Sequence, residues 1–171
     1  MLLALYWGLA QAQPHTSEVR PAVRYEPSPT PVVQAMTDLA AVKEGDLVYD
    51  LGCGDGRLVI AAARLGARGV CVDIDPARIA DAQENARSAG VAERIQFRND
   101  DLFAVDLRDA TVVMLFLSQE FNLALKPRLQ KLKSGTRIVS HWHNMGDWKP
   151  HRALSVPRGW RDHPVYLWIV P

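Results

Sequence analysis

The spacing of apolar residues along the chain changes repeatedly, and the changes predict strands that alternate with helices. Short apolar runs predict strands at residues 47–51, 70–74, 95–98, 111–117, 136–142 and 165–170. Apolar positions three and four residues apart, with a few start and stop signals, predict helices at residues 32–42, 57–65, 76–90 and 120–132. Strands that alternate with helices form a mainly parallel sheet with right-handed crossovers, so the pattern predicts an α/β fold.

Local signals support two of these elements. The run from Thr111 to Leu117 is apolar throughout, which is typical of a central strand covered on both faces. Asp75 and Pro76 supply an N-cap followed by proline at the first helical position.

The length and composition allow one folded domain with an N-terminal lead-in. The 171 residues are 48% hydrophobic and 23% charged, a balance typical of a globular domain with one core. We expect residues 1–31 to form the lead-in and residues 32–171 the domain. Residues 1–10 are apolar and too few to span a bilayer, and Ala10-Gln11-Ala12 resembles a signal-peptidase site. No Lys or Arg precedes Arg20, so the segment is either signal-like or a docking segment, which leaves membrane association through the N-terminus open.

Charge is unevenly distributed, although the formal net charge is only +1. Residues 119–171 contain 9 Lys or Arg against 3 Asp or Glu, and four of the five histidines. This asymmetry indicates either a face for an anionic partner or surface charge that is simply shared unequally.

The two cysteines, Cys53 and Cys71, lie in glycine-rich or apolar stretches. Two cysteines make no disulfide framework, and their spacing fits no zinc site. We therefore expect free, buried thiols.

The segment Asp50-Leu51-Gly52-Cys53-Gly54-Asp55-Gly56 carries the strongest functional signal. It follows the first strand and begins the first helix of the sheet, where open α/β sheets bind ligands. Its glycines permit positive φ and close approach of a ligand to the backbone. The third glycine comes one residue too early for a dinucleotide fingerprint, and the carboxylates would repel a pyrophosphate. The loop therefore favours a ligand that carries an amino acid and a positive charge.

Two further acidic segments lie at the carboxyl ends of predicted strands. Asp73 follows the loop by about 20 residues, the usual place for an acid that binds ribose hydroxyls, and Ile74 beside it is suited to an adenine face. Asp101, followed by Leu102, is placed to accept the amine of adenine, with a plain Asx turn as the alternative.

These three segments resemble the nucleotide-binding motifs of class I S-adenosylmethionine-dependent methyltransferases over about residues 45–143. The resemblance implies a three-layer Rossmann-like fold with a seven-stranded sheet in the order 3-2-1-4-5-7-6, the last strand antiparallel. It also implies S-adenosyl-L-methionine as cofactor. Asp50 and the Gly52–Gly56 loop, including Cys53 and Gly54, would hold the methionine part, Asp73 the ribose, and Asp101 with Leu102 the adenine.

Other segments resemble a narrower family of protein-lysine methyltransferases, which includes the mitochondrial enzymes for ATP synthase subunit c and the adenine nucleotide translocase. The similar segments are Tyr25-Glu26-Pro27-Ser28-Pro29, Asn122-Leu123-Ala124-Leu125-Lys126-Pro127, residues 135–141 and Met145-Gly146-Asp147-Trp148. This chain has Phe116-Leu117-Ser118-Gln119 where that family has an aromatic–leucine–leucine–proline stretch, and His143 replaces an aromatic residue. These differences leave the substrate open.

Methyl transfer from a sulfonium requires mainly alignment of the nucleophile. For a lysine acceptor, an apolar channel would also favour the neutral amine. The candidates to line that channel are Tyr25, Glu120, Asn122, His141 and Trp142. None of them is a clear general base. His141 and His143 would share one strand face, but no third residue is suitably spaced, so we expect no metal.

The sequence thus predicts a methyltransferase that acts on a protein lysine. One alternative is an RNA or small-molecule methyltransferase, although an Asn-Pro-Pro-aromatic tetrapeptide is missing after the fourth strand. The other is a cofactor-binding module without catalysis. We expect a cytoplasmic location, because the cofactor is made there.

Overall fold

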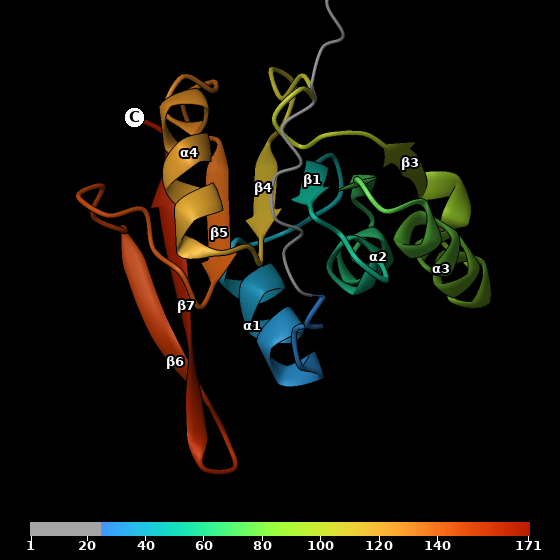
Figure 1. The fold of residues 1–171 in the computed structure, drawn as a ribbon, viewed down its shortest axis with the longest axis horizontal. Coiled ribbons are helices and arrows are strands. Elements are labelled where there is room, and N and C mark those ends of the chain that lie inside the picture. Colours follow the sequence, from blue (N-terminus) through green and yellow to red (C-terminus); the bar gives the residue numbers. More distant parts are fainter. Residues whose placement is uncertain (1–24) are drawn as a thin grey trace, which may run out of the picture.

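Seven strands form one sheet in the computed structural model, which describes residues 25–171 (Figure 1). The strands are β1 (Leu47–Leu51), β2 (Arg68–Asp73), β3 (Ile95–Asn99), β4 (Val112–Leu115), β5 (Arg137–His141), β6 (Arg152–Arg158) and β7 (Arg161–Ile169). Their order is β3-β2-β1-β4-β5-β7-β6. The first five are mutually parallel, and β7 is antiparallel to both β5 and β6. The α/β fold class and the sheet order are therefore confirmed.

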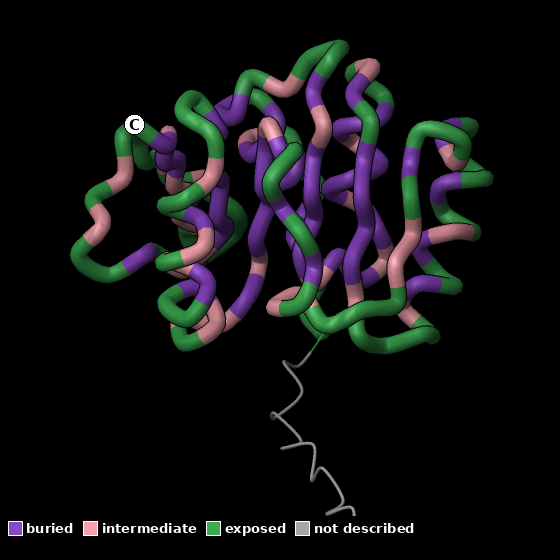
Figure 2. Tube along the Cα trace, turned by 90° about the horizontal axis from the view of Figure 1, so that it is seen from above, coloured by how far each residue is buried: buried purple, intermediate pink, exposed green. Residues whose placement is uncertain are grey.

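Helices cover both faces of this sheet. They are α1 (Thr30–Leu39), α2 (Arg57–Arg64), α3 (Pro76–Ser88) and α4 (Gln119–Leu129), with a short 3-10 helix η1 (Ala92–Arg94) before β3. Side chains of β4 alternate between the faces: Val112 and Met114 pack with α1 and α2, whereas Val113 and Leu115 pack with Leu125 of α4. Figure 2 shows the buried strands running through the centre of the molecule. The apolar run at residues 111–117 is thus explained by burial on both sides.

Two helices begin at side-chain caps. Asp75 accepts a hydrogen bond from the backbone N–H of Ala77 at 2.8 Å, which confirms the predicted start of α3. The Ser118 side chain accepts a hydrogen bond from the backbone N–H of Phe121 at 3.3 Å and caps α4, which begins four residues after the end of β4. The predicted strand at residues 111–117 is therefore shorter in the structure, because residues 116–118 form the connection to this helix.

The C-terminal hairpin is the main element that the apolar pattern did not predict. β6 is largely exposed and contains Pro157, and its apolar alternation is limited to the half-buried Leu154 and Val156, which is too short a signal to predict a strand. β7 begins at Arg161, four residues before the predicted strand, because its first residues are exposed as well. Figure 1 shows the two strands extending as a long ribbon beyond the other strands.

The predicted apolar segment at residues 1–10 and its signal-like sequence lie outside the described residues. Among residues 25–171, the structure contains no helix that is both long and apolar enough to cross a membrane.

Candidate active site

The loop after β1 depends on its glycines. Gly52, Gly54 and Gly56 have φ values of 76°, 54° and 79°, in the left-handed region where a side chain is strained. A Cβ atom on Gly54 would lie 2.5 Å from the Cε2 atom of Tyr25. Tyr25 therefore covers the loop, and the chain leaves no room for a side chain at Gly54.

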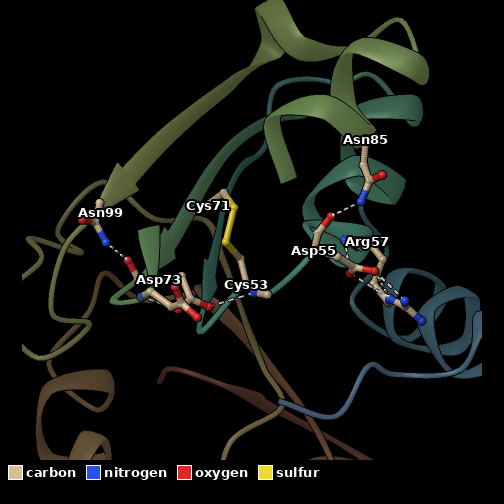
Figure 3. Close-up of a disulfide and its surroundings, with 9 residues drawn as sticks. Cys53, Asp55, Arg57, Cys71, Asp73, Asn85 and Asn99 are labelled. Atoms are coloured by element: carbon tan, nitrogen blue, oxygen red, sulfur yellow. Dashed lines mark hydrogen bonds and ion pairs between the residues drawn. A yellow bond between two sulfur atoms is a disulfide. The ribbon is translucent and has the colours of Figure 1, made fainter. Parts of the chain in front are cut away.

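Asp73 at the end of β2 is joined to this loop (Figure 3). Its Oδ2 atom accepts a hydrogen bond from the backbone N–H of Gly54 at 2.9 Å, and its Oδ1 atom accepts one from Asp75 at 3.0 Å. Asn99 donates to the backbone carbonyls of Asp73 and Ile74 at 3.0 and 2.9 Å. Ile74 is 71% exposed, an unusual fraction for isoleucine next to a buried strand. An exposed apolar side chain beside this acid is suited to a flat aromatic ligand.

Asp50 is the unusual carboxylate of the site. It is 1% exposed, and its Oδ2 atom has no hydrogen-bond partner among the described residues. Burial raises the pKa of Asp50 to about 8 against a hydrogen bond from the Val59 backbone, with smaller contributions in the same direction from the nearby Asp73 and Asp55 carboxylates. An unpaired buried carboxylate is costly, so a cation bound beside it would stabilise the ionised form.

Asp55, in contrast, is neutralised within the chain. The Arg57 guanidinium pairs with it at 2.5 Å and holds the pKa of that carboxyl low against the effect of burial. Arg57 also donates to the Ser28 carbonyl at 2.7 Å. Asp55 therefore helps, through Arg57, to join Ser28 to the start of α2. Asp50 is the carboxylate that remains for a cationic ligand.

The cysteine prediction is wrong, because Cys53 and Cys71 form a disulfide (Figure 3). The loop after β1 turns back onto β2, and the Cys53 N–H donates to the Val72 carbonyl at 3.0 Å. This turn brings Cys53 beside Cys71, which the separation of 18 residues could not reveal. The Cys53 side chain and N–H are therefore both engaged within the protein, and the Cys53 carbonyl accepts a hydrogen bond from the Gly56 N–H at 2.8 Å.

The third predicted segment forms a turn at the end of β3. The Asp101 Oδ1 atom accepts a hydrogen bond from the Phe103 N–H at 2.9 Å, which is the Asx turn considered as the alternative. Asp101 remains exposed, while Leu102 packs partly against the core. Arg128 of α4 donates to the backbone carbonyls of residues 102, 103 and 105 and holds the turn in place. The role of Asp101 and Leu102 toward adenine stays a prediction.

The predicted channel residues separate into different environments. Tyr25 is 43% exposed at the glycine loop, with the Arg78 guanidinium 4.7 Å from its ring centroid. Glu120 is exposed in the first turn of α4. Asn122 is fully buried and donates to Ser140 Oγ at 3.0 Å and to the His143 carbonyl at 2.9 Å. Asn122 thus holds the segment after β5 in position.

His141 is buried and neutral. Its Nδ1 atom lies 3.0 Å from Ser28 Oγ and its Nε2 atom 3.0 Å from His163 Nδ1. Burial, with a smaller contribution from His163, lowers the pKa of His141 to about 3. Both ring nitrogens are thus engaged by protein atoms, and the geometry is that of a structural hydrogen-bonding residue.

The expected pairing of two imidazoles on one strand face is wrong. β5 ends at His141, and Trp142 has a left-handed φ of 72°, which redirects the chain before His143. Within residues 25–171 no group of three or more His, Cys, Asp or Glu side chains is arranged to hold a metal ion.

A pocket of about 180 Å³ lies beside these residues. Glu26 and Pro27 line it next to Tyr25 in the chain, and Phe116 and Trp142 contribute aromatic walls from the connections after β4 and β5. Residues 158, 161 and 163 of the C-terminal hairpin complete it. The hairpin residues were not predicted from the sequence; the signal that could have found them is the turn-forming glycine of Arg158-Gly159-Trp160-Arg161.

The sheet order, the glycine loop, the acid at the end of β2 and the unpaired Asp50 together define a class I S-adenosylmethionine-dependent methyltransferase. The sulfonium and ammonium groups of that cofactor would supply the cation that Asp50 lacks, and the contact of Asp73 with its ribose stays a prediction. The residues present therefore fit S-adenosylmethionine.

Comparison with known proteins identifies the family. The chain belongs to the family described as "ANTKMT methyltransferase domain", which matches residues 50–152. It is 42% identical to a protein-lysine N-methyltransferase of Saccharolobus islandicus over 88% of this chain and 95% of that protein. It is 33% identical to the mouse adenine nucleotide translocase lysine N-methyltransferase over 69% of this chain and 52% of the mouse protein.

A solved structure is similar over most of its length. A crystal structure described as an RNA methyltransferase from Salinibacter ruber, in complex with S-adenosylhomocysteine, matches with a TM-score of 0.79 and 48% identity. The match covers 85% of this chain and 94% of that chain. The presence of S-adenosylhomocysteine in that structure agrees with the cofactor assigned here.

Proposed function

We propose that this methyltransferase transfers the methyl group of S-adenosylmethionine to a lysine side chain of a protein. The observation that carries the proposal is the similarity to the Saccharolobus protein-lysine N-methyltransferase, which extends over nearly the whole of both chains. The pocket lined by Glu26 and Trp142 supports it, because Glu26 directly follows Tyr25, whose ring lies against Gly54 of the cofactor loop.

Methyl transfer from a sulfonium depends little on a general base. The cofactor supplies a methyl group on a positively charged sulfur; the lysine nitrogen bonds to that carbon as the carbon–sulfur bond breaks, and the bonding electrons stay on sulfur. The amine must be neutral to react, and its proton passes to water. Phe116, Trp142 and the neutral His141 exclude water from one side of the pocket, which lowers the pKa of an amine placed there.

A second candidate is methyl transfer to RNA. The Salinibacter protein that is 48% identical to this chain is described as an RNA methyltransferase. The net positive charge of residues 119–171 is compatible with a nucleic acid. Both curated relatives named above are described as lysine methyltransferases, which favours protein.

Methyl-labelled cofactor distinguishes the two. The enzyme is incubated with whole-cell lysate and tritiated S-adenosylmethionine, and the product is divided and treated with either ribonuclease or protease. We expect label that survives ribonuclease and is released by protease. Label released only by ribonuclease would contradict the proposal and support RNA.

A further inference from the structure

The turn between β6 and β7 places two arginines directly opposite each other. Arg158 pairs with Arg161 in the antiparallel register, across the two-residue turn formed by Gly159 and Trp160. Gly159 has a φ of 61°, the conformation that a tight hairpin turn of this kind requires at its first central residue. Like charges that face each other across a strand pair are destabilising. The fold thus holds two guanidiniums together at a cost in free energy.

Neither arginine is neutralised by the protein. Within residues 25–171, no carboxylate forms an ion pair with Arg158 or Arg161, although six other arginines of the described chain have such partners. The Arg161 guanidinium instead lies 4.0 Å from the centroid of the Trp142 ring. A guanidinium stacked on an aromatic face keeps its N–H donors free at its edge, where they can bind an anion in bidentate fashion.

Both arginines line the same pocket as Trp142 and Phe116, next to the proposed acceptor position. Among the described residues that line the pocket, Glu26 is the one carboxylate, against two guanidiniums. Two of the three lining histidines add no charge near pH 7, because burial lowers the pKa of both His141 and His143. The pocket therefore has a positive potential, which is unsuited to a lysine ammonium on its own.

We infer that Arg158 and Arg161 form a subsite for a carboxylate of the protein substrate, on an Asp or Glu side chain close to the acceptor lysine. This inference deepens the proposed lysine methylation and rests on it. A carboxylate bound there pairs with the two guanidiniums, and the acceptor amine lies beside an ion pair instead of two free cations.

The size of the pocket favours an acidic side chain over the phosphates of RNA. Its volume of about 180 Å³ is well below the range of about 300–1,000 Å³ in which small-molecule sites fall, so it holds a single side chain more readily than a nucleotide.

The test uses the whole protein, S-adenosylmethionine and synthetic peptides that share one central lysine and differ in their flanks, with Glu, Gln or Lys at neighbouring positions. Arg158→Gln/Arg161→Gln is compared with the wild type and with Arg152→Gln, an exposed arginine of β6 that does not line the pocket. Thermal melting and S-adenosylhomocysteine calorimetry verify that each variant is folded and binds the cofactor. Methyl-lysine is measured by mass spectrometry.

We expect the wild type to methylate the Glu-flanked peptides with a kcat/KM about tenfold above that of the Gln-flanked ones. This ratio corresponds to the free energy of one charge-assisted hydrogen bond. The Gln/Gln variant should reduce this ratio to about one with unchanged cofactor affinity. Arg152→Gln should retain the ratio. Arg158→Lys/Arg161→Lys should retain part of it, because lysine keeps the positive charge but lacks the paired N–H donors of the guanidinium.

Three results would overturn the inference. Lysine methylation without preference for acidic flanks, or a preference that survives in the Gln/Gln variant, contradicts the subsite and leaves the proposed function intact. Methyl transfer to mixed-sequence RNA that the Gln/Gln variant loses assigns the arginines to phosphate. Methylation of no lysine peptide at all contradicts the proposed function, and the inference fails with it.

Discussion

The Oδ2 atom of Asp73 accepts a hydrogen bond from the backbone N–H of Gly54 at 2.9 Å, so the acid at the end of β2 and the loop after β1 form one unit. A substitution of Asp73 or of Gly54 therefore affects the position of the other residue. The cofactor site can thus be tested by substitutions at either position.

Asp73→Ala should weaken the binding of S-adenosylhomocysteine by about 1.5–3 kcal/mol, the range for loss of charge-assisted hydrogen bonds. The substitution removes the carboxylate predicted to bind the ribose, which is also the acceptor for the Gly54 N–H. Isothermal calorimetry measures the effect, with the exposed Asp109→Ala as a control at a distance from the loop. Equal affinities of wild type and Asp73→Ala would exclude Asp73 from the site.

Gly54→Val should abolish cofactor binding. Its Cβ would lie 2.5 Å from the Tyr25 ring, and the φ of 54° adds strain. Gly90→Val is the matched control: its φ of 69° imposes similar strain, but no atom lies within 4 Å of the added Cβ. Both variants should therefore melt at lower temperature than the wild type, and Gly54→Val alone should lose binding. Binding by Gly54→Val at wild-type affinity would show that the loop is not the site.

Cofactor binding should release a proton from Asp50 near pH 7. The pKa of Asp50 is raised to about 8, so the side chain is mostly protonated at pH 7 before a cationic ligand arrives. A bound ammonium or sulfonium favours the carboxylate. The enthalpy of S-adenosylhomocysteine binding at pH 7 should thus depend on the ionisation enthalpy of the buffer, and Asp50→Asn should remove the dependence. A buffer-independent enthalpy in the wild type would contradict this role.

The same shift has a consequence for stability. The pKa of Asp50 in the folded protein lies above the ordinary value of 3.8, so between about pH 4 and pH 8 the folded state binds more protons than the unfolded state. The contribution of Asp50 to the unfolding free energy therefore falls as the pH rises through that window. Asp50→Asn should gain stability relative to the wild type as the pH rises from 5 to 8, measured by urea unfolding without cofactor.

The Cys53–Cys71 disulfide should stabilise the fold and the loop together. Closing a loop of about this length contributes roughly 3 kcal/mol in the chain-entropy description. Cys53→Ala/Cys71→Ala should therefore unfold at lower urea concentration than the oxidised wild type, and a dithiol reductant should lower wild-type stability without affecting the variant. Identical unfolding curves for oxidised and reduced wild type would show that the bond contributes nothing.

Features for which a local sequence signal has one structural meaning could be predicted from the sequence. The apolar run at residues 111–117 and the cap at Asp75 located central elements, and the glycines after β1 adopt the positive φ values expected of the loop. Contacts between residues that are distant in the sequence could not be predicted in this way. The disulfide requires the loop after β1 to turn back onto β2, and the pairing of His141 with His163 requires the antiparallel return of β7. Neither contact leaves a signal in the spacing of the residues concerned.

The most direct test of lysine methylation is tandem mass spectrometry of lysate proteins after incubation with the enzyme and S-adenosylmethionine that carries a deuterated methyl group. The account predicts peptides in which the mass of one or more heavy methyl groups is located on a lysine, and none in the parallel reaction with Asp73→Ala at low cofactor concentration. Heavy methyl groups found only in RNA or in small molecules, with no methyl-lysine gained, would contradict it.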